Sequence, residues 1–327
     1  MNKCIKWLIT AFLAGMTAFA LLCLVCFFYS NIPVHYASET GVTEYYWEKS
    51  SFYCRMTEGF GFGRTNNEGF NDLRDYHAGD RIDVLLMGSS QMDAQNVRQQ
   101  DSTAAQLDAL FGGDKTVYNI GTAGHTMLYC VKHLDAALKR YQPKVVVIEY
   151  FGDGFSAEEL QSVLDGTLPD IPSHNEGIVG MLQHIPLLRL LYSKLLDGAG
   201  AESADMQTVP KSDGTELIAP LIEKVDEICR RHGVRPVILN YTTFSVDPNG
   251  IAQRAPVSPQ TAAMREECAR LGITFTDVTD SFMELYNTEH IMSSGFANTE
   301  PGWGHLNKHG HRVIAEVLYK LLRETEG

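Results

Sequence analysis

The sequence predicts an α/β fold: a three-layer α/β/α sandwich around a central parallel sheet of about five strands, preceded by one transmembrane helix. Two observations carry this prediction. Short apolar runs alternate with helical patterns along most of the chain, and such runs are typical of strands buried on both faces of a parallel sheet. The first 30 residues instead hold one uninterrupted apolar segment.

That apolar segment covers residues 7–29, which contain no charged side chain. Crossing hydrocarbon takes roughly 20 residues, so residues 1–30 are predicted to be a cytoplasmic stub and a transmembrane anchor. Lys3 and Lys6 precede the segment, and positive charge on that side places the N-terminus in the cytoplasm and the rest outside the cell membrane. A cleaved signal peptide is the competing interpretation, although its apolar core normally spans about 7–15 residues.

An aromatic-rich neck, residues 31–80, follows the anchor. Its aromatic residues include Tyr45, Tyr46, Trp47, Phe52, Tyr53, Phe60, Phe62 and Phe70. We expect the neck to lie over the domain and its rings to pack there, because aromatic side chains bury large apolar areas. A carbohydrate-binding platform is the alternative.

The third part of the chain, residues 81–327, is predicted to be one domain with an insertion at about 154–214. Its strands are expected at residues 82–87, 116–119, 144–150, 235–241 and 272–278. Its helices are expected at residues 102–111, 126–140, 216–232, 259–271 and 308–323. This alternation implies right-handed βαβ units. The insertion holds an apolar helix near residues 185–196 and is expected to form a subdomain or lid.

Composition excludes one class of partner and gives no sign of a cofactor. The net charge is −13, which argues against nucleic acid because no basic surface is available to neutralise phosphates. His305, His309 and His311 could form a metal cluster, but no H-E-x-x-H motif occurs. We therefore expect no metal, with His309 and His311 as surface residues at a helix start.

Candidate chemistry is expected at one edge of the sheet, because ligands of parallel α/β sheets bind beyond the carboxyl ends of the strands. Ser90 follows the first strand in the turn Gly88-Ser89-Ser90, where a serine acts as a nucleophile if a base reaches it. Gly124 follows the second strand, and its N–H could point at a developing oxyanion. His305 precedes the last helix and is the candidate base.

In this order the segments resemble the SGNH/GDSL hydrolase superfamily over roughly residues 82–153 and 215–323. The resemblance is carried by residues 85–90 (LLMGSS), 119–126 (NIGTAGHT) and 303–310 (WGHLNKHG). It implies a flavodoxin-like SGNH fold, no cofactor, Ser90 as nucleophile, His305 as base and Gly124 as oxyanion donor. The residues expected to bind substrate are Ser89, Asn119 and Asp153.

Two positions depart from the pattern of that superfamily. Gly302 stands where an Asp usually precedes the catalytic His by three residues, and Gly152 stands where an Asn usually donates to the oxyanion. The usual Asp fixes the imidazole tautomer. Three interpretations remain open: a backbone carbonyl orients His305, Glu300 replaces the Asp, or the site binds without turnover.

The sequence therefore predicts a membrane-anchored, extracytoplasmic serine esterase or O-acyltransferase that acts on acyl esters of a cell-envelope polymer. The GSS variant on an anchor is similar to the envelope branch of the superfamily, which includes the lipoteichoic acid D-alanylation protein DltD and alginate acetylation proteins. That likeness implies a polysaccharide or teichoic-acid-like polymer as substrate and a multi-pass membrane acyltransferase as partner. The alternative is a degraded SGNH-fold protein that binds the polymer or assists such an acyltransferase.

Overall fold

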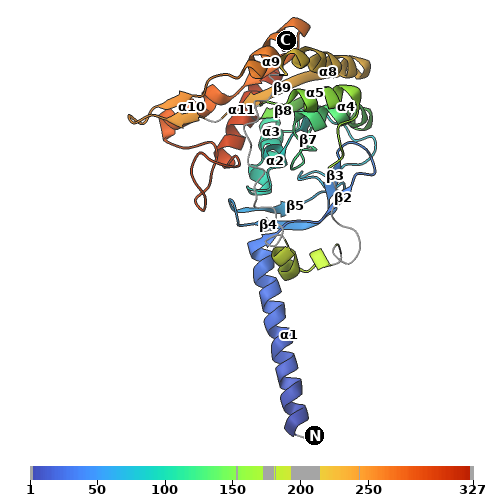
Figure 1. Cartoon of the computed structure of the whole chain (residues 1–327), viewed down its shortest axis with the longest axis vertical. Helices are drawn as coiled ribbons and strands as arrows, with labels where there is room; N and C mark the ends of the chain where they lie inside the picture. The colour runs from blue at the N-terminus through green and yellow to red at the C-terminus, as the bar shows by residue number, and fades with distance from the viewer. Residues whose placement is uncertain are drawn as a thin grey trace.

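One long helix carries the rest of the molecule. The structure is a computed structural model and describes residues 3–151, 154–171, 180, 182–192, 214–242 and 244–324. Helix α1 (Lys3–Tyr29) projects alone, and the other elements gather beyond its C-terminal end (Figure 1). Among the described residues, α1 is the one helix long and apolar enough to cross a membrane.

A five-stranded parallel sheet forms the centre of the domain, as predicted. Its strands are β6 (Val84–Met87), β7 (Val117–Asn119), β8 (Val145–Phe151), β9 (Arg235–Tyr241) and β12 (Thr274–Asp277). They lie in the order β12-β9-β8-β6-β7, and every neighbouring pair is parallel. This is the doubly wound order found in flavodoxin, and the order of strands reverses beside β6. Whatever follows β6 therefore lies at the usual ligand-binding position.

Helices cover both faces of the sheet and form two apolar cores. One face packs against α4 (Met127–Tyr141), α5 (Ala157–Asp165), α8 (Ile218–His232) and α9 (Pro259–Leu271). The other face packs against α3 (Thr103–Phe111), α10 (Thr279–Glu289) and α11 (Lys308–Glu324). The short helices are α2 (Ser90–Asp93), η1 (Gln99–Asp101) and η2 (Thr215–Leu217). Helix α10 and the hairpin of β10 (Phe244–Val246) and β11 (Ala252–Arg254) were not predicted from the sequence.

The neck is made of two small antiparallel sheets between α1 and the parallel sheet (Figure 1). One contains β1 (Ser30–Asn31), β4 (Phe52–Arg55) and β5 (Gly61–Arg64), and the other pairs β2 (His35–Ala37) with β3 (Tyr45–Trp47). The aromatic side chains divide into two groups. Buried are Tyr45, Trp47, Tyr53 and Phe70, whereas Phe52, Phe60 and Phe62 are exposed.

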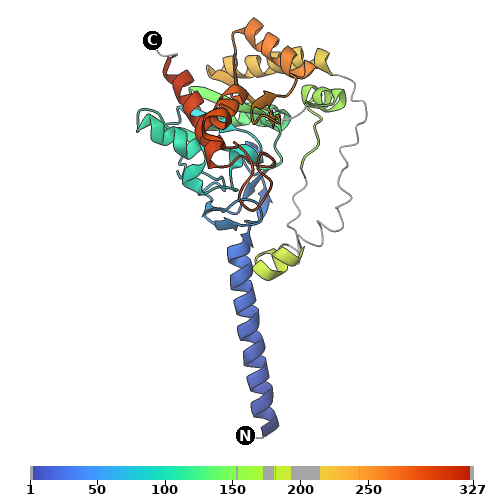
Figure 2. The same ribbon diagram turned by 90° about the vertical axis from the view of Figure 1, so that its left-hand side faces the viewer.

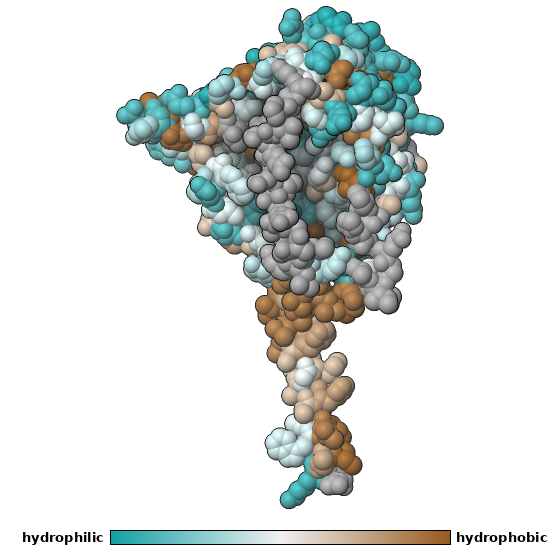
Figure 3. Space-filling view, in the orientation of Figure 1, coloured by the Kyte–Doolittle hydropathy of each residue, from teal (hydrophilic) through white to brown (hydrophobic). Residues whose placement is uncertain are grey.

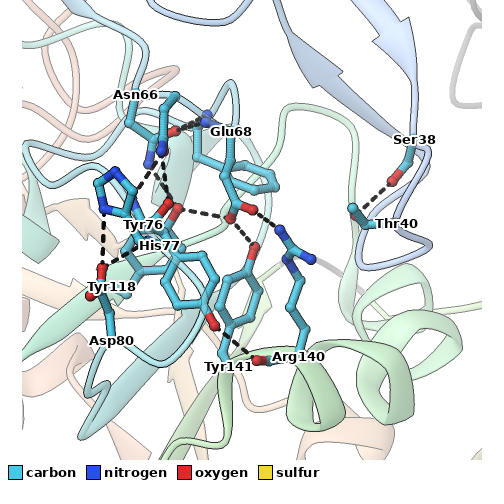
Figure 4. A network of polar contacts seen from close by, with 12 residues as sticks. Ser38, Thr40, Asn66, Glu68, Tyr76, His77, Asp80, Tyr118, Arg140 and Tyr141 are labelled. Atoms are coloured by element: carbon cyan, nitrogen blue, oxygen red, sulfur yellow. Dashed lines mark hydrogen bonds and ion pairs between the residues drawn. The ribbon is translucent and has the colours of Figure 1, made fainter.

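Polar contacts join the neck firmly to the domain (Figure 4). Glu68 of the neck accepts hydrogen bonds from the hydroxyls of Tyr118 (3.1 Å) and Tyr141 (2.7 Å) and pairs with Arg140. Tyr76 donates its hydroxyl to the carbonyl of Arg140 at 3.0 Å. Because these partners belong to β7 and α4, the neck is part of the folded domain rather than a loose spacer.

The insertion returns toward the anchor. Residues 182–192, which include helical turns within the apolar helix expected near 185–196, lie beside the upper end of α1 in both views (Figures 1 and 2). Arg189 donates to Oδ1 of Asn31 at 2.9 Å, which ties this segment to β1. Residues 193–196 of the expected helix lie outside the described residues.

Candidate active site

Ser90 is the first residue of α2, directly beyond the carboxyl end of β6. The turn needs Gly88, because a Cβ there would lie 2.5 Å from Oε2 of Glu149. Ser89 is the N-cap of α2, and its hydroxyl accepts a hydrogen bond from the backbone N–H of Gln91 at 3.2 Å, which satisfies an otherwise unpaired helix donor. The strand, turn and cap together hold the hydroxyl of Ser90 partly exposed at the sheet edge.

The imidazole of His305 faces Ser90, with its Nε2 2.9 Å from Ser90 Oγ. His305 precedes α11, and the two residues that follow it are held by hydrogen bonds. The N–H of Leu306 donates to Gln91 Oε1 at 2.8 Å, and Asn307 Nδ2 donates to the carbonyl of Met292 at 2.7 Å. The structure thus brings together the two residues that the sequence analysis named as nucleophile and base.

The other side of His305 is held by Glu58, a residue of the neck. His305 Nδ1 lies 2.7 Å from Oε2 of Glu58, and the backbone N–H of His305 donates to Oε1 at 2.8 Å. Burial alone would raise the pKa of Glu58, but the two hydrogen bonds from His305 and the charges of His305 and Arg55 outweigh it and lower that pKa. Glu58 is therefore ionised near neutral pH and accepts the Nδ1 proton.

Glu58 reaches this place because the β4–β5 hairpin is clamped to the domain from two sides. Nδ2 of Asn96, from the loop after α2, donates to the carbonyl of Glu58 at 3.0 Å. The side chain of Asn298 accepts from the N–H of Gly59 at 3.0 Å and donates to the carbonyl of Met56 at 2.8 Å. Ser90, His305 and Glu58 thus come from separate segments that meet at one edge of the sheet.

Two glycines explain why the acid comes from the neck. Gly304 has φ +85°, and a Cβ there would lie 2.4 Å from Oε1 of Glu58. Gly302, at the position of the usual Asp, has φ +83°, and its Cβ would meet Cε of Met292 at 2.3 Å. A side chain at position 302 is thus strained. Glu300, one of the three alternatives left open by the sequence, is exposed, and the carboxylate at Nδ1 of His305 is that of Glu58.

Behind the nucleophile lies a second carboxylate, Glu149 in the middle of β8. Its Oε2 accepts from the backbone N–H of Ser89 at 2.6 Å and from the Ser89 hydroxyl at 2.7 Å, and its Oε1 accepts from the hydroxyl of Tyr241. Glu149 is fully buried, and burial raises its pKa. The hydroxyl of Ser89, a residue expected to bind substrate, is bonded to Glu149, and its contact with substrate stays a prediction.

The second block places Gly124 in an exposed position on the loop between β7 and α4. This loop lies against α2, since a Cβ on Gly121 would lie 2.8 Å from Met92. Asn119, expected to bind substrate, is fully buried. Its Nδ2 donates to the carbonyl of Met92 at 2.9 Å and its Oδ1 accepts from the N–H of Gly121 at 2.9 Å, so it joins the loop to α2 rather than facing the cleft.

Three other residues named from the sequence, Asp153, Gly152 and His311, remain to be placed. Asp153 and Gly152 lie outside the described residues. His311 is buried rather than on the surface, with Nδ1 2.9 Å from Oγ1 of Thr103, and burial lowers its pKa to about 3. Within the described part of the chain, no group of three or more His, Cys, Asp or Glu residues is arranged to hold a metal ion.

A cavity of about 560 Å³ opens beside the Glu58 hairpin. Its lining combines apolar rings with basic groups from α11 and the loop after α2. The main contributors are Phe60, Phe62, Phe296, Arg98, Lys308 and His309. Asn307, two residues after His305, also lines it, so the cavity adjoins the site.

Glu58 and Glu149 were not predicted from the sequence as residues of the site. Glu149 had a visible signal, because it is the lone acid in the apolar run of β8, and acids are almost never fully buried without partners. Glu58 had a weaker one: it lies between the alternating segments FYCR and GFGR, which suit a hairpin. Nothing in the local pattern indicates that this hairpin reaches position 305.

Comparisons with known proteins do not assign this chain to a family. No protein-family model and no curated protein matches the chain. Among solved structures, the esterase EstA from Pseudoalteromonas sp. overlays with a TM-score of 0.41 and 14% identity, covering 74% of this chain and 96% of that one. TesA gives 0.42 and 13%, covering 74% and 98%. The lipase/acylhydrolase from Enterococcus faecalis gives 0.40 and 12%, covering 75% and 96%. At these scores the overlays carry no argument about function.

Proposed function

We propose that this chain is a serine ester hydrolase or O-acyltransferase of the SGNH/GDSL type. The observation that carries the proposal is the unbroken relay Ser90–His305–Glu58, with separations of 2.9 Å and 2.7 Å. A hydroxyl on one ring nitrogen and a carboxylate on the other let a neutral imidazole take the hydroxyl proton. The sequence blocks at residues 85–90, 119–126 and 303–310 support the assignment to this superfamily.

The proposed reaction begins when Ser90 Oγ attacks the carbonyl carbon of an acyl ester. The hydroxyl proton passes to Nε2 of His305, and Glu58 stabilises the imidazolium that forms. When the tetrahedral intermediate collapses, His305 returns that proton to the leaving alkoxide, and the acyl group stays on Ser90. Water or a hydroxyl group then gives its proton to His305, attacks the acyl carbon and restores free Ser90.

The negative oxygen of the intermediate needs hydrogen-bond donors, which are worth about 10²–10³ each in rate. We assign this role to the backbone N–H groups of Ser90 and Gly124. Ser90 opens α2, where N–H groups are unpaired within the helix. Gly124 lies on the exposed loop that packs beside α2. No Asn side chain of the usual kind is available at position 152.

We further propose that α1 anchors the enzyme in the cell membrane with the catalytic domain outside. The uncharged segment, residues 7–29, and the lysines before it support this topology. A site tethered there favours a membrane-linked or wall-linked ester over a freely diffusing one. The proposed substrate is an acylated envelope polysaccharide or teichoic-acid-like polymer, with a multi-pass membrane acyltransferase as the donor partner where a polymer hydroxyl replaces water.

The rival hypothesis is a degraded site that binds a polymer without turnover. That hypothesis expects His305 to turn away from Ser90 or to lack an acceptor behind Nδ1. The distances on both ring nitrogens favour chemistry over binding alone.

A fluorophosphonate probe tests the proposal, because it reacts with activated serine hydroxyls. We expect the full chain in detergent to be labelled, the Ser90→Ala variant to be unlabelled, and the Ser245→Ala variant, whose serine is exposed on β10, to retain labelling. Circular dichroism establishes that each variant is folded. Equal labelling of wild type and Ser90→Ala, or no labelling of folded wild type, would contradict the nucleophile assignment. Product analysis with and without a polyol acceptor then separates transfer from hydrolysis.

A further inference from the structure

The neck sheet starts where the apolar helix ends, with no linker between them. α1 ends at Tyr29 and β1 begins at Ser30. The N–H of Met56 donates to the carbonyl of Tyr29 at 3.0 Å, and the thiol of Cys54 lies 3.0 Å from the carbonyl of Phe28. Adjacent strands are about 4.8 Å apart, so even β5, two strands from β1, lies close to the end of α1.

The two faces of this sheet differ sharply. Tyr53 and Gly61 point toward the domain: the Tyr53 hydroxyl donates to Asn71 at 3.0 Å, and a Cβ on Gly61 would overlap the backbone at Gln95. Because side chains alternate along a strand, the intervening residues point away from the domain. Phe52 pairs with Arg64, and Cys54 pairs with Phe62 on that outer face.

The outer face exposes large apolar groups. Phe52 is 65% exposed and Phe62 is 49% exposed. Exposed apolar patches of this kind mark interaction sites, and Arg64 beside Phe52 adds a cation that suits phosphate groups. The same surface continues onto α1, where Phe28 and Tyr29 are also exposed.

The insertion extends this surface independently. Residues 182–192 lie beside the upper end of α1 (Figure 2) and are tied to β1 by Arg189. Leu182 and Leu191 of this segment are exposed. In the space-filling view the apolar surface widens where the stalk meets the domain (Figure 3). Two segments far apart in sequence thus place apolar side chains at the same level.

We propose that this surface rests in the outer headgroup region of the bilayer that α1 crosses. This membrane-proximal face consists of Phe28, Tyr29, Phe52, Phe62, Leu182 and Leu191. Aromatic rings favour that level of a membrane. The inference rests on the proposed membrane anchoring, and the continuity of the sheet with α1 identifies lipid as the occupant.

Contact with lipid would fix the height of the catalytic site. Glu58 lies on the loop of the same β4–β5 hairpin, two residues beyond Met56, whose N–H is bonded to the end of α1. The bilayer holds one face of the hairpin, and the domain holds the other. The relay therefore opens within reach of esters carried by molecules anchored in the outer leaflet.

Fluorescence quenching in nanodiscs tests the surface directly. The full chain, with Trp7→Phe and Trp303→Phe to remove two native tryptophans, carries Phe62→Trp and is reconstituted with lipids brominated near the headgroup. Buried Trp47 remains as an internal reference. After the emission of Trp47 is subtracted, we expect the emission of the tryptophan introduced at position 62 to be at least twofold lower in brominated than in unbrominated lipid. Ala269→Trp on α9, which lies at the far end of the domain from α1 (Figures 1 and 2), is the matched control and should show none.

Equal fluorescence of the Phe62→Trp and Ala269→Trp variants in both lipids would overturn the inference and assign the face to a protein partner instead. Native Trp7, retained in a parallel sample, reports by its own quenching whether α1 is in the bilayer. Labelling of Ser90 by fluorophosphonate is measured separately. The three measurements are independent: quenching at position 62 tests the membrane-proximal face, quenching of Trp7 tests the anchor, and labelling of Ser90 tests the catalytic proposal.

Discussion

The carboxylate of Glu58 holds both N–H groups that His305 offers on one side: Nδ1 at 2.7 Å and the backbone nitrogen at 2.8 Å, across 247 positions of sequence. A two-point contact of this kind fixes the orientation of the imidazole as well as its tautomer. It also makes the proposed catalysis depend on the neck, because no other element described in the structure supplies a carboxylate to His305.

Replacing Glu58 with Gln tests that dependence. The amide has nearly the same shape, but it can offer an N–H to Nδ1 and so favour the wrong tautomer. We expect kcat for a model ester to fall by about 10³–10⁴ with little change in KM. Glu300→Gln is the matched control and should change kcat less than twofold. Similar losses in both variants would mean that Glu58 is not the orienting acid.

Gly304 and Gly302 form a second matched pair, because their φ angles are +85° and +83°. An alanine at either position costs roughly 1–2 kcal/mol of backbone strain. Only at position 304 does the new Cβ meet Glu58. We therefore expect Gly304→Ala and Gly302→Ala to lose similar thermal stability, whereas Gly304→Ala alone loses at least tenfold in kcat. Equal kcat values in the two variants would refute the steric explanation.

Glu149 should act as a positioning residue through Ser89. In Glu149→Gln, one acceptor oxygen becomes an NH₂ group, so at least one of the bonds from Ser89 or Tyr241 is lost. We expect the rate of fluorophosphonate labelling at Ser90 to fall about tenfold while the fold is retained, since misplacing a nucleophile by about 1 Å costs up to 10²-fold. Tyr241→Phe, which removes a donor more distant from Ser90, should have a smaller effect. An unchanged labelling rate in Glu149→Gln would show that Glu149 does not position Ser90.

Asp93, buried under the neck, should make stability depend on pH. Burial raises its pKa to about 7, although Trp47 donates to its Oδ2 at 3.1 Å. The unfolded pKa is about 3.9, so between about pH 4 and pH 7 the folded state holds a proton that the unfolded state does not. Stability from this group is therefore complete below pH 4 and is lost as the pH rises through 7.

The Asp93→Asn variant should remove part of this pH dependence. Urea unfolding of the full chain in detergent at pH 5 and pH 8 measures it, and we expect the difference between the two pH values to shrink by up to about 3 kcal/mol. Asp72, whose pKa burial also raises to about 7, leaves a remaining slope. Glu266→Gln on the exposed side of α9 should leave the slope unchanged. A slope unaltered by Asp93→Asn would show that Asp93 is ionised in the folded state.

The parallel sheet could be predicted because most of its strands can be recognised from their own residues, without knowledge of their neighbours in space. A run such as VVVIEYF in β8 is apolar at nearly every position, and only a strand covered on both faces buries all of them. The ends of the strands then indicate where Ser90 and His305 lie, since both flank elements at one sheet edge. Positions that depend on chain topology in this way are accessible from sequence alone.

The rest of the site depends on contacts between distant segments. Glu58 joins His305 only because Asn96 and Asn298 clamp a hairpin that local pattern assigns to the neck. Asn119 carries the motif of a cleft residue, yet its buried side chain is bonded to the backbone of Asn71, Met92 and Gly121. Motif spacing gives the place of a residue along the chain, but the direction of its side chain is decided by packing.

If α1 anchors the chain as proposed, the position of Glu58 in the neck also determines what proteolysis near the anchor would release. A cut between Tyr29 and Ser30 would shed a fragment that keeps β4, β5 and the whole relay. A cut just after Arg64 would break the covalent link between Glu58 and the parallel-sheet domain, and Glu58 would then be held at His305 only by noncovalent contacts such as those of Asn96 and Asn298 with its hairpin. The position of the cut would thus decide whether the contact between Glu58 and His305 is maintained by the continuous chain or by noncovalent contacts alone.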